Sequence, residues 1–213
     1  MAQPPPAVWV GQALLLLPAY EGWAKRRFAP TRRKETMADE QLREELLKSQ
    51  VVFEGRLLRV RVDTVRTPDG HEATREVVEH PGAAAVVPIL EDGRALLVRQ
   101  FRQPAGKVLL EIPAGCLKPG ESPEACAARE LEEELGYRPR RLAHLTTCFL
   151  SPGYSNEQIH IFLATGLERV EARPEAGEVI EPAVIALDDV PALIERGEIQ
   201  DGKTIAGLLL AMM

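Results

Sequence analysis

The segment that most constrains the fold of this chain runs from residue 115 to residue 137 and reads GCLKPGESPEACAARELEEELGY. Its second half predicts a helix over residues 122–135. Serine at 122 is a favoured N-cap, Pro123 suits the first helical position, and Gly136 can end a helix. Gly115 and Gly120 bracket the loop before this helix. The segment therefore predicts a tight loop that leads directly into a well-capped helix.

The predicted helix carries acidic side chains in a spacing that favours a cation. Glu130 and Glu134 are four residues apart and share one helix face. Like charges at this spacing repel by a few tenths of a kcal/mol, so a cation between them is a natural explanation. Mg²⁺ prefers oxygen ligands and also takes phosphates from a substrate. The alternative is an acidic helix face that is simply solvated.

The full pattern is longer than the acidic face and resembles the Nudix box, G-x5-E-x7-R-E-U-x-E-E-x-G-U, in which U is a bulky apolar residue. Tyr137 is the one departure, because it is aromatic where an aliphatic residue is usual. The other positions of the box match at Gly115, Glu121, Arg129, Glu130, Leu131, Glu133, Glu134 and Gly136.

Membership of the Nudix family would imply a hydrolase that attacks, with water, a diphosphate linked to another moiety, using Mg²⁺ or Mn²⁺. By similarity, Arg129 holds the acidic cluster in place and Glu121 is structural. Glu133 contributes as a metal ligand or through water, and Glu133 and Arg129 count among the catalytic residues. The metal ligands implied by the resemblance are the backbone carbonyl of Ala114 and the carboxylates of Glu130, Glu133 and Glu134.

A second segment narrows the substrate. Residues 151–157 read SPGYSNE, and Pro152 lies 152 − 137 = 15 residues past the box. This loop resembles that of the ADP-ribose pyrophosphatase branch of the family. Glu157 ends the loop, and a carboxylate brought opposite the metal could act as general base or metal ligand. The alternative is an exposed loop glutamate.

Two further stretches resemble the same branch. Residues 99–102 read RQFR, and the resemblance assigns the second arginine, Arg102, to the phosphates, since a guanidinium can pair with them bidentately. Arg75 and Glu76 lie in REVVEHPG, which in this branch helps to bind adenosine across a domain-swapped homodimer. Residues 203–206, KTIA, resemble the C-terminal helix of the branch.

The remaining chain alternates short strands with turns. Thr67-Pro68-Asp69-Gly70 predicts a turn between two of them. We expect an α/β/α sandwich with a mixed sheet, preceded by an N-terminal antiparallel β-hairpin layer, rather than a doubly wound parallel sheet. A short helix or tail is expected over 38–48, and helices over 190–195 and 204–212. Strands are expected over 51–65, 72–79, 83–90, 95–101, 108–112, 145–150, 158–164 and 179–186.

The sequence also indicates how the chain divides into regions and where the protein is located. We expect a disordered leader or over-extended start over 1–36, a hairpin and dimerisation region over 37–82, and the hydrolase domain over 83–213. The apolar run over 7–17 is short for a membrane span, so no stable membrane association is expected. The net charge of −6 argues against nucleic acid. Three cysteines, an odd number without a CxxC pair, favour the cytoplasm.

The function expected from these features is the Mg²⁺-dependent hydrolysis of ADP-ribose to AMP and ribose 5-phosphate, by an enzyme that acts as a homodimer on a small nucleoside diphosphate. Two alternatives stay open. One is a Nudix hydrolase of another nucleotide sugar or a dinucleotide, because the helix handles only the shared diphosphate. The other is a non-catalytic nucleotide-binding module, although such modules typically lose glutamates of the box.

Overall fold

The structure is a computed structural model, and it describes residues 36–174 and 177–213. These residues fall into two compact units, each described here by itself. Of the described residues, the first unit holds 83–147 and 160–213, and the second holds 36–82 together with 148–159. Except for Thr36, the predicted leader over 1–36 lies outside the described residues.

The second unit is built on a three-stranded antiparallel sheet of order β1-β2-β3, formed by β1 (Glu45–Glu54), β2 (Arg59–Arg66) and β3 (Glu72–Glu79). The predicted turn over 67–70 joins β2 to β3, with Gly70 at a φ of 89° that glycine adopts without strain. Residues 148–159 join this unit through the end of β3, where the Val78 N–H donates to the Tyr154 carbonyl at 2.7 Å.

The short helix or tail expected over 38–48 covers only part of that range. Only the short helix α2 (Met37–Glu40) forms, capped by Thr36 and Asp39. The residues from Glu45 onward pair with β2 instead, with Glu45 opposite Arg66. The local composition favours a helix, but pairing with a neighbouring strand overrides a weak helix propensity. The N-terminal layer therefore has one strand more than a hairpin.

The first unit contains two sheets. The four-stranded sheet has the order β7-β4-β9-β8, and the three-stranded sheet has the order β10-β5-β6, with β5 antiparallel to both of its neighbours. The strands are β4 (Ala83–Pro88), β5 (Ala95–Arg102), β6 (Lys107–Glu111), β7 (Ala114–Cys116), β8 (Tyr137–Phe149), β9 (Gln158–Arg169) and β10 (Ile180–Ile185).

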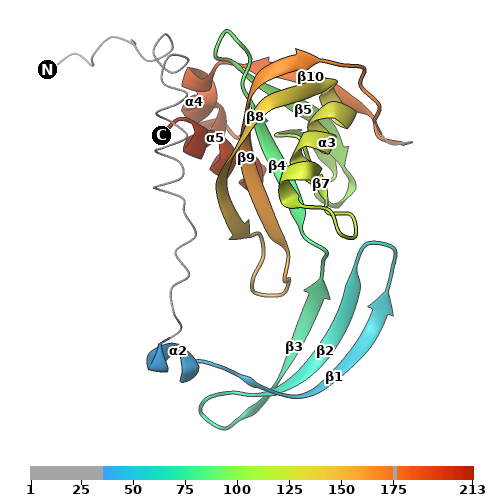
Figure 1. The fold of residues 1–213 in the computed structure, drawn as a ribbon. Coiled ribbons are helices and arrows are strands. Elements are labelled where there is room, and N and C mark those ends of the chain that lie inside the picture. Colours follow the sequence, from blue (N-terminus) through green and yellow to red (C-terminus); the bar gives the residue numbers. More distant parts are fainter. Residues whose placement is uncertain (1–35, 175–176) are drawn as a thin grey trace, which may run out of the picture. The chain divides into compact units, whose positions relative to one another are not determined.

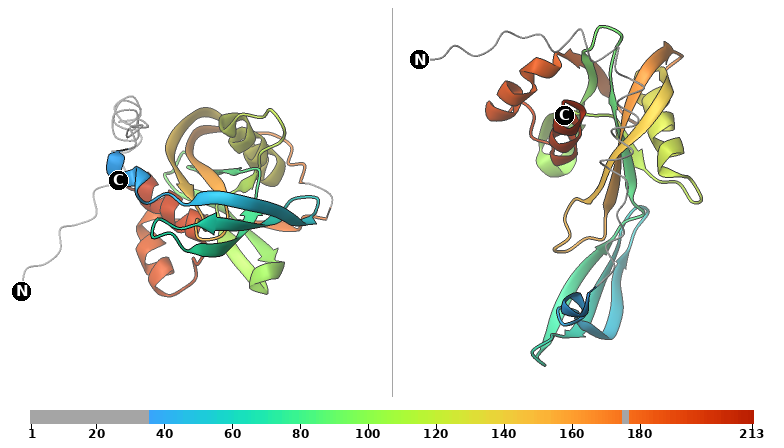
Figure 2. Two further views of the ribbon diagram at one scale, coloured as in Figure 1. Left: turned by 90° about the horizontal axis from the view of Figure 1, so that it is seen from below. Right: turned by 60° about the vertical axis from the view of Figure 1, so that its left-hand side comes forward.

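Helices cover both faces of this unit. α3 (Pro123–Leu135) lies on one side of the strands, and α4 (Val190–Glu195) and α5 (Gly202–Ala211) lie on the other (Figures 1 and 2). Short 3₁₀ turns occupy Gln103–Ala105 and Leu187–Asp189. The expected α/β/α sandwich is confirmed by this arrangement.

The core between α3 and the strands explains why the helix forms where it does. Cys126, Ala127, Leu131 and Leu135 of α3 pack against buried residues of β4, β5 and β9. Fully burying an apolar side chain of this size stabilises the fold by about 1.5–3 kcal/mol. α3 is thus fixed by its apolar face, which leaves its acidic residues along the edge and the outer side.

Some boundaries differ from expectation. β8 begins at Tyr137, directly after α3, rather than at 145. β7 overlaps the start of the loop expected between Gly115 and Gly120. Polar and charged residues alternate through the first half of β8, so its apolar signal is weak. None of the helices in the described ranges combines the length and apolar character that crossing a bilayer demands.

Candidate active site

The caps predicted for α3 are present. The Ser122 hydroxyl accepts a hydrogen bond from the Ala125 N–H at 3.2 Å, and Pro123 occupies the first helical position. Gly136 ends the helix at a φ of 69°. A Cβ there would come within 2.8 Å of the Val170 carbonyl oxygen, so glycine is needed for both its φ and its size. These caps fix where each glutamate of the helix stands.

Glu130 and Glu134 lie on the buried edge of α3, directly under the loop that precedes it. Both residues are buried. A Cβ built on Gly115 would fall 1.8 Å from Oε1 of Glu130, so the loop crosses this carboxylate at a distance that only glycine allows. The Ala114 N–H donates a hydrogen bond to Glu134. The loop and the two carboxylates therefore form one closely packed cradle.

The cradle leaves one carboxylate oxygen without a partner. Oε2 of Glu134 is buried and accepts no hydrogen bond. Burial, together with the negative charges of Glu130 and Glu178, raises the pKa of Glu134 to about 8. Burial also raises the pKa of Glu130, although Arg129 opposes the shift. An unpaired buried carboxylate oxygen is costly and calls for a cationic partner.

Arg129 joins the acidic residues of the segment. Its guanidinium pairs bidentately with Glu121 at 2.7 and 2.9 Å, and its Nη1 donates to Glu133 at 2.8 Å and to Glu130 at 2.5 Å. The hydrogen bond from Arg129 lowers the pKa of Glu121 to about 2. This geometry is consistent with the predicted holding role of Arg129 and with a structural role for Glu121.

These residues fit a hard divalent cation in part. Within residues 36–174 and 177–213, no three His, Cys, Asp or Glu side chains are already gathered in a metal-holding arrangement. The reason is that Glu133 points to Arg129, as does one oxygen of Glu130. The orphaned oxygen of Glu134 beside Glu130 nevertheless supplies the carboxylate donors that Mg²⁺ prefers. Glu133 would have to leave Arg129 to join them.

Arg102, predicted to bind phosphate, belongs to the same unit. Its guanidinium donates to Glu111 at 2.8 and 3.0 Å while its side chain keeps 38% of its surface exposed. The charge of Glu134 acts on Arg102 and favours its ionised form. A partly exposed guanidinium near the cradle is placed to meet an anion.

Glu178 is an acidic residue that the sequence interpretation missed. Its charge raises the pKa of both Glu130 and Glu134, so it stands within electrostatic range of the cradle. It follows β9 in a stretch of varied sequence, EARPEAGEVIE, that carries four acidic residues. No spacing rule separates Glu178 from the other three, and only the folded arrangement singles it out.

Three predicted residues belong to the second unit. Oε1 of Glu157 lies 3.8 Å from Nδ1 of His80, and Asn156 beside it accepts a hydrogen bond from the His80 N–H at 2.8 Å. Arg75 pairs with Glu44, and Glu76 lies opposite Val62 in the sheet. The roles of Glu157, Arg75 and Glu76 stay predictions.

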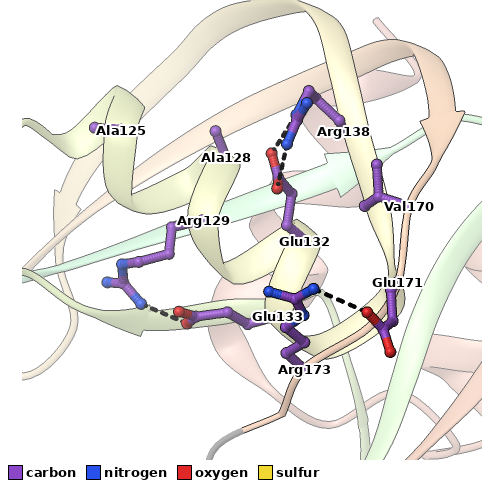
Figure 3. A pocket seen from close by; sticks show the side chains of 9 residues that line it. All are labelled: Ala125, Ala128, Arg129, Glu132, Glu133, Arg138, Val170, Glu171 and Arg173. Atoms are coloured by element: carbon purple, nitrogen blue, oxygen red, sulfur yellow. Dashed lines mark hydrogen bonds and ion pairs between the residues drawn. The ribbon is translucent and has the colours of Figure 1, made fainter.

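A separate hollow of about 610 Å³ borders the outward face of α3. Figure 3 shows Arg138 turned onto Glu132 and Arg173 turned onto Glu171, and these pairs are 2.7 and 2.9 Å long. Ala125 and Ala128 form part of its wall. Arg129 and Glu133 lie on its border with the cradle, its other arginines are already matched by carboxylates, and Glu130 and Glu134 do not line it. We therefore place the candidate active site at the cradle and not in this hollow.

Comparisons with known proteins agree with this geometry. The NUDIX domain model matches residues 79–208, and the model of the nucleoside diphosphate sugar hydrolase N-terminal domain matches residues 44–78. The chain belongs to the Nudix family and is a Nudix hydrolase.

Particular relatives carry more specific names. The chain is 39% identical over 165 residues to an ADP-ribose pyrophosphatase of Bacillus subtilis, covering 76% of this chain and 89% of that protein. It is 36% identical over 149 residues to a GDP-mannose pyrophosphatase of Yersinia pestis, covering 65% and 75%. A crystal structure of an ADP compounds hydrolase shares the fold, with a TM-score of 0.71 at 24% identity over 79% of this chain and 91% of that chain.

Proposed function

We propose that this enzyme hydrolyses the diphosphate bond of ADP-ribose to AMP and ribose 5-phosphate in a Mg²⁺-dependent reaction. The observation that carries the proposal is the orphaned oxygen of Glu134 beside Glu130 under the loop at Gly115. The similarity to an ADP-ribose pyrophosphatase and the SPG loop at residues 151–153 support the choice of substrate.

Each of the candidate site residues has a distinct role in this proposal. Glu130 and Glu134 would hold Mg²⁺ or Mn²⁺, and the Ala114 carbonyl and Glu133 would complete the set. When bound there, the cation would neutralise charge on the diphosphate and lower the pKa of a coordinated water. Arg129 keeps the acidic side chains in place. Arg102 pairs with phosphate oxygens and holds the diphosphate in register.

The residue that accepts the proton of the attacking water has two candidates. Glu157 is the prediction from sequence, and Glu178 is supported by its electrostatic coupling to Glu130 and Glu134. Glu157→Gln and Glu178→Gln distinguish them. The general base is the residue whose loss lowers kcat by roughly 10²–10⁴-fold and removes the acidic limb of the kcat–pH profile. Its counterpart should keep that limb.

A substrate panel tests the function as a whole. Purified protein is assayed with Mg²⁺ against ADP-ribose, GDP-mannose and a dinucleoside diphosphate, and the products are identified. We expect AMP and ribose 5-phosphate, and no turnover in EDTA. A preference of tenfold or more in kcat/KM for GDP-mannose would assign another nucleotide sugar. Turnover of none of them would support the non-catalytic binding module.

The assembly and location are also proposed. β1 is an edge strand with exposed apolar side chains, among them Leu46, Val52 and Phe53. Such a surface suits a homodimer in which Arg75 and Glu76 help to bind the adenosine of the substrate. The free thiols of Cys126 and Cys148 are consistent with a reducing cytoplasm.

A further inference from the structure

A buried carboxylate, Glu111, lies at the end of β6 between two cations. Only 1% of its surface is exposed. It accepts hydrogen bonds from Nε and Nη2 of Arg102 at 2.8 and 3.0 Å, and a third from Nζ of Lys203. Burying a carboxylate is costly unless it is paired and hydrogen-bonded. Glu111 is fully paired, so its position is tightly determined.

The first turn of α5 holds this carboxylate from the other side. Nζ of Lys203 also pairs with Asp201 at 2.9 Å, and Asp201 caps α5 by accepting from the Thr204 N–H at 2.9 Å. The Thr204 hydroxyl in turn accepts a hydrogen bond from the Ile112 N–H at 2.9 Å. The stretch at 203–206 thus binds both the side chain and the backbone at the end of β6.

Arg102 is the exposed end of this network of Asp201, Lys203 and Glu111. Two of the three guanidinium nitrogens of Arg102 engage Glu111, and the side chain remains 38% exposed. Glu134 of the cradle acts on the same guanidinium. A bidentate carboxylate fixes the plane of a guanidinium, and the plane decides where its remaining donors point. Glu111 itself is too deeply buried to meet a substrate.

We propose that Glu111 is a positioning residue, which the first turn of α5 locks in place through Lys203 and which holds Arg102 ready for the diphosphate. This inference rests on the proposed function, because it assigns Arg102 to the phosphates. The competing interpretation is an ion-pair network that only stabilises the fold.

The test is a double-mutant cycle measured on the full chain with Mg²⁺ and ADP-ribose. Glu111→Gln keeps the shape but loses the charge, and it should raise KM about tenfold while changing kcat much less. Arg102→Ala should raise KM at least as much. In the Arg102→Ala protein, adding Glu111→Gln should cause no further loss, since Glu111 acts through Arg102. Multiplicative effects of the two changes would overturn the proposal.

Two further variants keep the test decisive. Arg99 lies on β5, as Arg102 does, and forms an exposed ion pair with Glu181. Glu181→Gln removes that partner and should leave KM unchanged. If Glu111→Gln does not fold, Lys203→Met takes its place, because it leaves the Arg102–Glu111 pair intact. Lys203→Met should raise KM a few-fold in the otherwise wild-type protein, and it should not raise KM further in the Arg102→Ala protein. An unchanged KM would overturn the proposal.

The activity of the wild-type protein distinguishes a failure of the proposed function from a failure of the role proposed for Glu111. An inactive wild type overturns the proposed function and, with it, the role of Glu111. An active wild type with an unaltered KM in Glu111→Gln overturns only the role of Glu111.

Discussion

At the residue scale, Glu134 shows what the folded environment adds to a motif. The sequence places it one helical turn from Glu130, and the spacing alone leaves open whether the two carboxylates hold a cation or are simply solvated. In the structure both are buried, and one oxygen of Glu134 has no partner. Burial by the loop at 114–115 depends on contacts that no local pattern encodes. The same holds for Glu178, whose link to the cradle exists only in the folded chain.

Replacing Glu134 tests whether it belongs to the metal site. Glu134→Gln should lower kcat on the order of a hundredfold or more, because a carboxylate ligand is lost. Its melting temperature in EDTA should stay near that of wild type, whereas the rise on adding Mg²⁺ should disappear. Glu132→Gln is the matched control, because Glu132 lies on the same helix and pairs outward with Arg138. Wild-type turnover in Glu134→Gln would remove it from the metal set.

Glu121 gives a pH dependence with a definite sign. Its hydrogen bonds from Arg129 lower its pKa from 4.5 to about 2 in the folded protein. A lowered acid pKa contributes stability that is present above pH 4.5 and is lost as the pH falls towards 2. Glu121→Gln should therefore cost roughly 2 kcal/mol of unfolding free energy at pH 7, consistent with losing charge-assisted hydrogen bonds to Arg129.

The measurement is denaturant unfolding at several pH values between 5 and 2. The difference between wild type and Glu121→Gln should shrink through this window. Glu168→Gln, which removes one partner of the exposed Arg140 pair, should cost little at any pH. A difference for Glu121→Gln that stays constant down to pH 2 would contradict the assignment.

At the element scale, the loop before α3 and the helix itself act as one unit. The prediction of the helix from Ser122 to Gly136 was confirmed because its caps are local signals. The first residues of β1, 45–48, fell in the range expected as a short helix or tail, because their pairing with β2 decides their conformation. Helix caps, which depend on neighbouring residues, can therefore be predicted from this sequence, whereas the pairing of strands cannot.

Gly115→Ala tests the contact between the loop and the helix. The added methyl would lie 1.8 Å from Oε1 of Glu130, so the carboxylate or the loop has to move. We expect kcat/KM to fall about tenfold or more, since a shift near 1 Å at a reacting site is costly. Weaker Mg²⁺ binding, followed by the thermal shift, should accompany it. Gly202→Ala, where nothing lies within 4 Å, should behave as wild type; equal activities of the two variants would show that the loop tolerates the methyl.

At the scale of the whole molecule, the chain divides its tasks between two units. The first carries the cradle, Arg102 and the network around Glu111. The second carries Glu157, Arg75 and Glu76 together with the sheet β1-β2-β3. The spacing of Glu130 and Glu134 points to a cation by itself, whereas Arg75 and Glu76 could be assigned only through resemblance to a family.

The exposed strand β1 leads to a prediction about assembly. Leu46, Val52 and Phe53 are each more than half exposed, which is unusual for apolar residues clustered on one strand. Such a surface is stabilised when a second copy covers it, so wild type should elute at twice the mass of the chain. Leu46→Glu combined with Val52→Glu should give monomers, because dimerisation would bury the new charges.

Multi-angle light scattering after size exclusion measures the masses, and assays on the same samples connect assembly to function. If adenosine binds across the dimer, the monomeric variant should show a KM for ADP-ribose raised about tenfold while Mg²⁺ still shifts its melting temperature, because the cradle lies in the first unit. Val184→Glu, at an exposed valine of β10, should remain dimeric. A wild type that is monomeric at assay concentrations would remove the dimer and the proposed part of Arg75 and Glu76 in it, and would leave the chemistry of the cradle untouched.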